Sequence, residues 1–279
     1  MKLLNGRELA EFIMERQARE VRALRQAHHV LPKLAIVVTV DNPVIDVYMR
    51  LKQRYGEEIL IDVEVLRVDQ AEAAATIKRL NDDELVHGII VQLPLEDPSQ
   101  TDEIVNLVAP SKDVDGLNTE AIYDPATAMA IMWLLAGYNV NLQGKKVVLV
   151  GRGKLVGAPL EKILLASDVD VSVADKSTSA EDLATMVSEA DVIISATGVP
   201  GIVAADMIKL DAVVVDAGVA SEGGKTVGDL AEDVYKRDDL TVTPTKGGVG
   251  PLTVCALFEN VIRAARSTTT TNIKANIEA

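Results

Sequence analysis

The stretch VVLVGRGKLVG, from Val147 to Gly157, decides how this chain folds. Its first four residues are apolar and largely β-branched, which predicts a buried strand, and a helix is expected to begin near Val156. Between them, Gly151 allows a tight turn and Gly153 lets backbone approach a phosphate, while the following helix N-terminus directs N–H groups at the anion. The spacing is GxGxxxG rather than GxGxxG, so a glycine-rich turn without a ligand stays open as an alternative.

Short apolar runs alternate with amphipathic stretches on both sides of this motif. The expected strands are residues 34–40, 59–66, 87–91, 147–150, 169–174, 191–195 and 212–215. The expected helices are residues 7–26, 71–80, 126–135, 180–188 and 251–266, one that ends near residue 55 and one that begins near residue 156. This alternation predicts parallel sheets covered by helices, and the later half has the layout of a nucleotide-binding half-Rossmann unit. The Ser/Thr/Asn-rich tail from Ser267 is expected to be frayed.

Length, composition and charge limit the class of protein. The 279 residues are long for one compact domain and suit two. Aromatic residues make up only 3%, so the cores must be built from Val, Ile, Leu and Ala, which suits parallel sheets. The net charge of −14 argues against a nucleic-acid partner, which requires a basic surface.

The rare residue types exclude further classes. Cys255 is the single cysteine, so no intrachain disulfide can form, and a structural zinc cage is not expected. His28, His29 and His87 lack metal-ligand spacing, so no metal is expected. Charged residues begin almost at the first position and no apolar run is long enough to span a bilayer. We therefore expect no signal peptide, no membrane partner and a cytoplasmic protein.

The residues after the second strand of the nucleotide half bear on the choice of dinucleotide. Asp175 closes that strand, where an acid accepts hydrogen bonds from the adenine ribose and repels a 2′-phosphate. Lys176, Ser177 and Thr178 stand beside it and could instead bind that phosphate. These two signals conflict.

A tyrosine and a lysine lie four residues apart on the helix that follows the first long strand. Tyr48 and Lys52 therefore project from one face, and a lysine held near a phenol and out of bulk water can have a lowered pKa and move protons. A YxxxK pair alone also occurs by chance on exposed helices. Gln92 adds weight, because it stands directly after a buried strand and before Pro94, where open α/β sheets bind ligands.

Two further motifs are candidates for the walls of a binding cleft. The run SKDVDG contributes Asp113 and Asp115 just before the second expected domain. For Asp113 the ordinary alternative, a carboxylate that stabilises a turn, is the stronger interpretation. The run TKGGVGP, residues 245–251, has enough glycine to be a tight loop whose backbone can lie close to a ligand.

Together these motifs resemble the methylenetetrahydrofolate dehydrogenase/cyclohydrolase family, nearly end to end from LNGRELA to GGVGPLTVCALFENVI. The elements YMRLK, VQLPL, KDVDG, GRGKLVGAPL, SATGVPG, VVVDAGV, VGDL and GGVGPLT occur in that family's order and spacing. The resemblance implies oxidation of 5,10-methylenetetrahydrofolate by NAD(P)⁺, followed by hydrolysis of the methenyl product to 10-formyltetrahydrofolate in the same cleft.

The resemblance also implies a two-domain α/β architecture. Residues 1–118, joined by the returning C-terminal helix (residues 251–279), would form an N-terminal folate-binding catalytic domain. Residues 119–250 would form a Rossmann-like NAD(P)-binding domain. The implied partners are tetrahydrofolate derivatives and a second copy of the chain, in a homodimer through the nucleotide domain.

The family's site residues carry over to matching positions. Lys52 would be the general acid/base of the hydrolytic step, Gln92 would hydrogen-bond and orient it, Tyr48 would stack on the folate, and Asp115 would anchor the pterin. The other implied folate-site residues are Leu93, Pro94, Gly247, Gly248 and Pro251. The implied cofactor-site residues are Gly151, Arg152, Gly153, Val156, Gly157, Asp175, Lys176, Ser177, Thr197, Gly198 and Val219.

Several positions depart from the family pattern. Ile45 stands where a small or hydroxyl residue is usual, Gly153 where a serine is common, Ala128 where a proline is usual, and Lys246 where a proline precedes GGVGP. The His-Ser-Arg-like segment that favours a 2′-phosphate is replaced by DKS, residues 175–177. NADP is the family default, and the acid in this segment makes NAD possible.

Three alternatives to the bifunctional enzyme stay open on sequence alone. The chain could retain only one of the two activities, and the altered cofactor segment makes loss of the dehydrogenase the more natural failure. It could be a different dehydrogenase, for shikimate-like or amino-acid substrates, although VQLPL and KDVDG count against this. It could also be a folate- or nucleotide-binding protein without catalysis.

Overall fold

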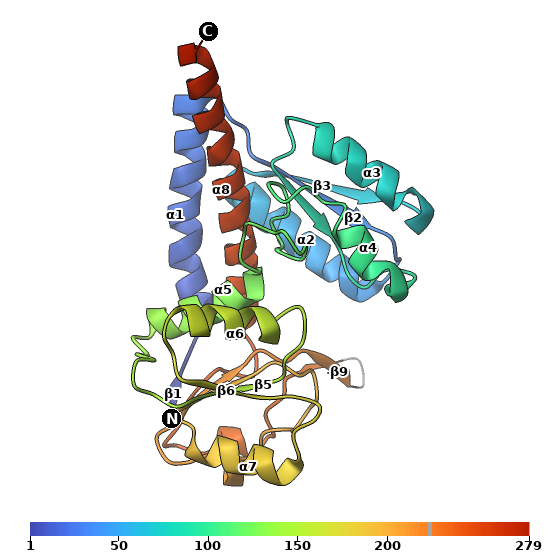
Figure 1. Cartoon of the computed structure of the whole chain (residues 1–279). Helices are drawn as coiled ribbons and strands as arrows, with labels where there is room; N and C mark the ends of the chain where they lie inside the picture. Colours follow the sequence, from blue (N-terminus) through green and yellow to red (C-terminus); the bar gives the residue numbers. More distant parts are fainter. Residues whose placement is uncertain (223–224, 279) are drawn as a thin grey trace. The chain divides into compact units, whose positions relative to one another are not determined.

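The structure, a computed structural model, describes residues 1–222 and 225–278 and consists of α-helices packed with parallel β-sheets (Figure 1). Its contacts divide the chain into two compact units. The six-stranded unit comprises Met1–Ala10 and Thr127–Thr253, and the three-stranded unit comprises Glu11–Ala126 and Val254–Ala279. Each unit has a parallel sheet of its own, as the alternation of strands and helices predicted.

The N-terminal residues lie in the six-stranded unit, whereas the sequence placed residues 1–118 in the first domain. The reason is strand β1 (Lys2–Leu3), which pairs in parallel with β11 (Thr241–Val242) near the other end of the chain. Two residues are too few to produce a periodic signal, so the sequence indicated neither strand. The other two divisions of the chain fall after Ala126 and Thr253.

The sheet of the three-stranded unit has the order β3-β2-β4. Its strands are β2 (Lys33–Val38), β3 (Asp62–Arg67) and β4 (Gly88–Val91). Its helices are α2 (Pro43–Ile59), α3 (Gln70–Asp82), the 3-10 helix η1 (Pro98–Gln100) and α4 (Thr101–Val105). The central strand β2 is almost wholly buried, and its Val37 packs with Ile89 of β4 and Ile77 of α3 in an aliphatic core.

Helices α1 (Gly6–His28) and α8 (Val249–Glu278) each contribute residues to both units. Within the three-stranded unit they lie side by side (Figure 1), and the buried Gln17 of α1 donates its amide to the carbonyl oxygen of Cys255 over 2.8 Å. Tyr55 of α2 donates its hydroxyl to Gln17 Oε1 over 2.7 Å. One buried glutamine therefore connects three helices.

Helix α8 is longer than the sequence indicated. The expectation of a helix over residues 251–266 and a frayed tail from Ser267 is wrong, because the helix continues to Glu278. No glycine or proline follows Pro251 to end it. The hydroxyls of residues 267–269 donate to carbonyl oxygens three residues earlier, so these polar side chains are accommodated on the helix.

The sheet of the six-stranded unit has the order β1-β11-β8-β7-β5-β6, and every pairing is parallel. Its remaining strands are β5 (Val147–Val150), β6 (Val171–Ala174), β7 (Val192–Ser195) and β8 (Val213–Asp216). Strands β9 (Ala220–Glu222) and β10 (Lys225–Val227) form a separate antiparallel pair. The helices are α5 (Ala126–Gly137, mostly in this unit), α6 (Gly157–Ala166), α7 (Ala180–Glu189), η2 (Ala205–Met207) and η3 (Val234–Lys236).

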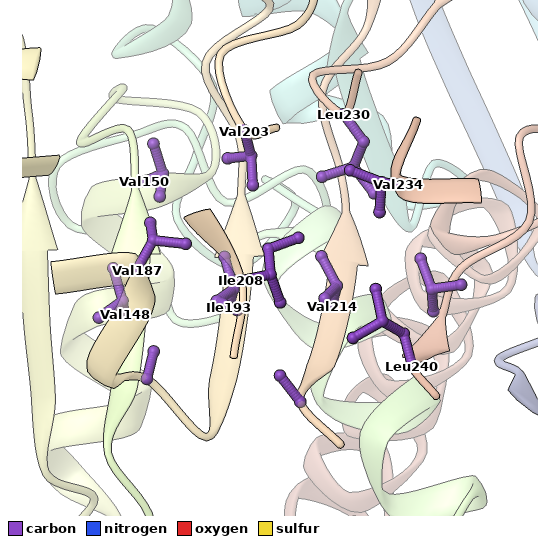
Figure 2. Packing of buried hydrophobic residues seen from close by; sticks show 13 residues of the cluster. Val148, Val150, Val187, Ile193, Val203, Ile208, Val214, Leu230, Val234 and Leu240 are labelled. Carbon is purple, nitrogen blue, oxygen red and sulfur yellow. The ribbon is translucent and has the colours of Figure 1, made fainter. Parts of the chain in front are cut away.

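The core on one side of this sheet is built from small aliphatic side chains (Figure 2). Val148 of β5, Ile193 of β7 and Val214 of β8 project from adjacent strands, and Val187 of α7 and Val234 of η3 cover them. Each of these five residues is at most 4% exposed. The low aromatic content of the chain therefore results in an aliphatic core, as expected for a sheet buried on both faces.

Two negative findings apply to residues 1–222 and 225–278, which are the residues that the structure describes. No helix there has the length and apolar character needed to cross a membrane. Nor do those residues contain a group of three or more His, Cys, Asp or Glu side chains arranged to hold a metal ion.

The central position of Ile193 makes it a test of this packing. Ile193→Ala should lower the free energy of unfolding by about 2–5 kcal/mol, because it leaves a cavity under the sheet. Leu210→Ala is the matched control, since that side chain is 74% exposed and its loss should change stability by less than about 0.5 kcal/mol. Denaturant unfolding followed by circular dichroism measures both, and equal effects would contradict the described core.

Candidate active site

A cavity of about 810 Å³ lies in the six-stranded unit at the carboxyl ends of β5, β6 and β7. This is the edge where open parallel sheets bind ligands, because the loops that follow the strands diverge there. The lining residues are Val150, Gly151, Arg152, Gly153, Ala174, Asp175, Lys176, Ser177, Thr178, Leu183, Ala196, Thr197, Val199 and Ile202.

The three glycines of the turn between β5 and α6 have different surroundings, so glycine is present at each for a different structural reason. Gly151 has φ +102°, and a Cβ there would lie 2.7 Å from the carbonyl oxygen of Ala196. A Cβ on Gly157 would lie 2.0 Å from the carbonyl oxygen of Gly151, so the first turn of α6 packs directly on this turn. By contrast, the Cβ position at Gly153 meets no atom within 4 Å, and this residue lines the cavity.

These positions fit the phosphates of a dinucleotide. The turn needs glycine at two places for packing and leaves open space at the third, where a ligand can reach the backbone. The following helix α6 begins at Gly157 and directs the positive end of its dipole toward this turn. The arrangement therefore suits an anionic group held by backbone rather than by a basic side chain.

A compact turn at residues 175–178 forms the other end of the cavity. Asp175 accepts hydrogen bonds from the backbone N–H of Ser177 over 2.9 Å and from its hydroxyl over 2.6 Å. These bonds hold the pKa of Asp175 below its usual range, so the carboxylate is charged at neutral pH. The backbone N–H of Thr178 donates to the carbonyl oxygen of Asp175, which closes the turn.

Arg152 of the glycine turn is engaged by a residue that the sequence did not single out. Its guanidinium contacts both carboxylate oxygens of Glu161 on α6, with Nε–Oε2 at 2.7 Å and Nη2–Oε1 at 3.2 Å. Hydrogen bonding to Glu161 raises the pKa of Arg152. The pairing could not be foreseen, because it depends on how the folded glycine turn and α6 bring together two side chains nine residues apart.

The structure brings most of the predicted cofactor residues to this cavity. Those that line it are Gly151, Arg152, Gly153, Asp175, Lys176, Ser177 and Thr197. Those that do not line it are Val156, Gly157, Gly198 and Val219. Gly198 follows the lining residue Thr197 and has φ +69°, while Val219 is 64% exposed. The apolar lining residues Leu183, Val199 and Ile202 were missed, although the motif SATGVPG already contained Val199.

A second constellation lies in the three-stranded unit, where α2 faces the end of β4. Lys52 Nζ donates a hydrogen bond to Gln92 Oε1 over 2.8 Å. Gln92 is itself fixed, because its backbone N–H donates to the carbonyl oxygen of Val37 and its amide donates to the carbonyl oxygen of Leu93. The Leu93–Pro94 peptide bond is cis. The lysine therefore has one defined acceptor at the carboxyl end of the sheet.

The charges in this constellation oppose the effect of burial. Burial lowers the pKa of Lys52, and the negative charge of Asp115 partly counters this. Burial likewise raises the pKa of Asp115, and the positive charge of Lys52 counters it. Tyr48, one helical turn before Lys52, is 41% exposed and offers its ring to solvent. A lysine with a lowered pKa beside a fixed amide and a carboxylate is suited to proton transfer.

The two acids of the motif KDVDG, Asp113 and Asp115, have different surroundings. Asp113 is 3% exposed and accepts hydrogen bonds from the backbone N–H groups of Gly116 and Asn118, at 3.1 and 2.7 Å. Lys112 donates to three carbonyl oxygens at the end of α3. Asp113 is therefore a turn carboxylate, and Asp115 is the acid whose charge acts on the lysine of α2.

The glycine loop before α8 packs against the start of α1 within the six-stranded unit. Gly247 has φ +87°, and its carbonyl oxygen accepts a hydrogen bond from the backbone N–H of Arg7. A Cβ on Gly6 would lie 1.8 Å from the carbonyl oxygen of Gly248, so two backbone segments meet here. Pro251 lies in the first turn of α8. The glycines thus have a packing reason in addition to the predicted contact with a ligand.

Comparisons with known proteins agree with these features. A model of the catalytic domain of tetrahydrofolate dehydrogenase/cyclohydrolase matches residues 4–115, and a model of the NAD(P)-binding domain of the same family matches residues 125–269. Bifunctional protein FolD of Exiguobacterium sibiricum is 35% identical, in an alignment that covers 95% of this chain and 99% of that protein. The protein of the same name from Lactobacillus helveticus is 37% identical over 95% and 98%.

Solved structures give the same result. The bifunctional methylenetetrahydrofolate dehydrogenase/cyclohydrolase FolD of Campylobacter jejuni superposes with a TM-score of 0.89 at 35% identity, covering 96% of this chain and 99% of that one. The Trypanosoma brucei methylenetetrahydrofolate dehydrogenase-cyclohydrolase, solved with NADP and an inhibitor, gives 0.88 at 31% identity, covering 95% and 97%. With both family models matched and such relatives aligned over nearly its whole length, the chain belongs to the tetrahydrofolate dehydrogenase/cyclohydrolase family.

Proposed function

We propose that this protein oxidises 5,10-methylenetetrahydrofolate with a nicotinamide dinucleotide and then hydrolyses the methenyl product to 10-formyltetrahydrofolate. The observation that carries the hydrolytic half is the hydrogen bond from Lys52 to a fixed Gln92, in surroundings that lower the pKa of the lysine. The cavity at the carboxyl ends of β5, β6 and β7, with its glycine turn, supports the oxidative half. Family membership supports both, because the matching relatives are named as bifunctional.

The folate contacts follow from the side chains around Lys52. The exposed ring of Tyr48 provides a flat face on which a pterin or aminobenzoyl ring can stack. Asp115 provides an acceptor for the amino and ring N–H groups of the pterin. Leu93 and Pro94 follow Gln92 directly and provide apolar contact beside it. These residues would hold the one-carbon unit next to the lysine.

Lys52 moves the protons in the hydrolytic step. In its neutral form the amine accepts a proton from the water that adds to the methenyl carbon. It then gives that proton to the ring nitrogen whose bond to the carbon breaks. The second proton of the water is released to solvent as the carbonyl forms, which leaves the formyl group on the other nitrogen. Gln92 holds the amine in one orientation throughout, and the lowered pKa increases the fraction of the amine that is neutral.

The six-stranded unit supplies the binding site for the dinucleotide, which when bound accepts the hydride of the oxidative step. We assign the pyrophosphate to the backbone at Gly153 and the N-terminus of α6, and the adenine ribose to Asp175. Thr197 and its neighbours after β7 form another wall of this site. Hydride transfer requires the methylene carbon to reach the nicotinamide at near-attack distance.

The charges around the ribose position favour NAD⁺ over NADP⁺. Asp175 is charged at neutral pH and would repel a 2′-phosphate, and Arg152, the nearby cation, is paired with Glu161. Lys176 lines the same cavity and acts in the opposite direction. We propose that the acid and the occupied arginine prevail, so that this chain departs from the NADP default of its family.

Replacing the lysine tests the hydrolytic assignment. Lys52→Met should lower the rate of methenyltetrahydrofolate hydrolysis by at least about 100-fold, the range expected when a general acid/base is lost, and leave dinucleotide binding unchanged. Lys78→Met is the matched control, because Lys78 is exposed on α3 of the same unit. A Lys52→Met protein that is folded and hydrolyses at the unmodified rate would remove Lys52 from the mechanism.

The pH dependence tests the role of Asp115. The negative charge of Asp115 raises the pKa of Lys52, so Asp115→Asn should lower that pKa further. Because the neutral amine is the active base, the rising limb of kcat/KM for hydrolysis should move to lower pH in Asp115→Asn. A limb that stays in place, or moves to higher pH, would show that the titrating group is not Lys52 coupled to Asp115.

Cofactor choice is tested by removing the two acids separately. Asp175→Ser should raise the ratio of kcat/KM for NADP⁺ over NAD⁺ by about tenfold, because a like charge near the 2′-phosphate is lost. Glu161→Gln should raise the same ratio by a few-fold, since exposed ion pairs are individually weak. The control is Glu181→Gln, an exposed acid of α7 outside the cavity lining. A ratio unchanged in both acid variants would mean that Lys176 and its neighbours set the choice.

A further inference from the structure

Two carboxylates, Asp216 and Asp229, lie close to each other's backbone segments in the six-stranded unit. Asp216, at the end of β8, accepts hydrogen bonds from the backbone N–H groups of Asp229 over 3.0 Å and Leu230 over 3.2 Å. Two glycines make the approach possible. A Cβ on Gly228 would lie 2.0 Å from Asp216 Oδ2, and a Cβ on Gly218 would lie 1.9 Å from Asp229 Oδ1. The motifs VVVDAGV and VGDL are therefore two halves of one arrangement.

Asp229 reaches beyond this arrangement to the end of the neighbouring strand β7. Its side chain is fully buried. One oxygen, Oδ2, accepts hydrogen bonds from the hydroxyl of Ser195 over 2.6 Å and from the backbone N–H of Thr197 over 2.7 Å. Two hydrogen bonds converge on one carboxylate oxygen in a place that excludes water, where hydrogen bonds are stronger than in solvent. The backbone from residue 195 to 197 is thereby fixed.

That backbone is a wall of the cofactor cavity. Ala196 and Thr197 both line it, although Asp229 itself does not. The glycine turn packs against the same residues, because a Cβ on Gly151 would lie 2.7 Å from the carbonyl oxygen of Ala196 and 2.9 Å from Thr197 Cγ2. A shift at the end of β7 would therefore be felt at the phosphate turn as well. Asp229 thus acts on both through one carboxylate oxygen.

The opposite end of β7 provides a natural comparison. Asp191 stands just before the strand and accepts hydrogen bonds from the backbone N–H of Lys146 over 2.9 Å and from the Lys209 ammonium over 2.7 Å. It stabilises the same sheet in a similar way, but no residue that it contacts lines the cavity. A comparison of variants at Asp191 and Asp229 therefore distinguishes a contribution to folding from a contribution to the cofactor site.

We propose that Asp229 is a positioning residue for the dinucleotide, which acts by fixing the segment 195–197 and through it the phosphate turn. The role rests on the proposed function, since it assumes that the cavity binds the dinucleotide. Removing the carboxylate would leave the buried hydroxyl of Ser195 and the backbone N–H of Thr197 without this acceptor, and the segment would have to rearrange. The dinucleotide would then bind a wall that is no longer preformed.

The test compares dinucleotide binding and hydrolysis in the same proteins. Titration with NADH, followed by its fluorescence, gives Kd for the full chain and for Asp229→Ala, Asp229→Asn and Asp191→Ala. Asp229→Ala should weaken NADH binding by about tenfold or more and raise the KM for NAD⁺ with a smaller change in kcat. Methenyltetrahydrofolate hydrolysis needs no dinucleotide, and it should stay within about twofold of the unmodified rate.

The two remaining variants distinguish a positioning role of Asp229 from a purely structural one. Asp229→Asn keeps one acceptor oxygen and should restore most of the affinity, whereas Asp191→Ala should lower thermal stability and leave Kd unchanged. Unchanged NADH binding in Asp229→Ala would overturn the proposal. Parallel losses of stability, hydrolysis and binding in both alanine variants would overturn it as well, in favour of a purely structural role. An unmodified protein that binds neither NADH nor NADPH would instead contradict the proposed function itself.

Discussion

All strands of a parallel sheet have their carboxyl ends at the same edge, and this constraint places Gln92 and the walls of the cofactor cavity. In the six-stranded unit the ends of β5, β6 and β7 carry the glycine turn, the Asp175 turn and the segment after Ser195. In the three-stranded unit the end of β4 carries Gln92, which meets the lysine of α2. The interiors of the strands are left to Val, Ile, Leu and Ala, so cores and sites are separated along each strand.

Burial decides which charged groups are adapted for chemistry. Burial lowers the pKa of Lys52 and raises the pKa of Asp115, so the two values move toward each other. Arg152 and Glu161 form a pair with better geometry but greater exposure, and such exposed pairs contribute little to stability. In the proposed function their effect is on ligand choice, because an engaged arginine is not available to a phosphate.

The sequence predicted the periodic parts of the structure and the residues that belong to contiguous motifs. Apolar runs and spacing predicted the strand at residues 147–150, the glycine turn that follows it and the parallel pairing of strands in both sheets. The pairing of β1 with β11 was not, because each has two residues and the partner lies at the other end of the chain. The length of α8 was also missed, since a Ser/Thr-rich composition suggested fraying while no residue actually ends the helix.

The candidate site shows the same division. Lys52, Gln92 and Asp115 were named from the sequence, and the structure brings them together in one unit. Glu161 and Asp229 were not named, because their contacts depend on which side chains the folded backbone brings within reach. The supporting role of such a residue cannot be predicted from local sequence, even where the residue belongs to a quoted motif, as Asp229 does in VGDL.

The most direct measurement follows both products of one reaction. The unmodified protein is mixed with 5,10-methylenetetrahydrofolate and NAD⁺, and reduced dinucleotide, methenyl-folate and 10-formyl-folate are quantified over time. If the protein catalyses both steps, the amount of reduced dinucleotide equals the sum of the two folate products, and 10-formyl-folate accumulates as the reaction proceeds. Failure of a folded protein to reduce either NAD⁺ or NADP⁺, or formation of methenyl-folate that is hydrolysed no faster than in buffer, would contradict the proposed function.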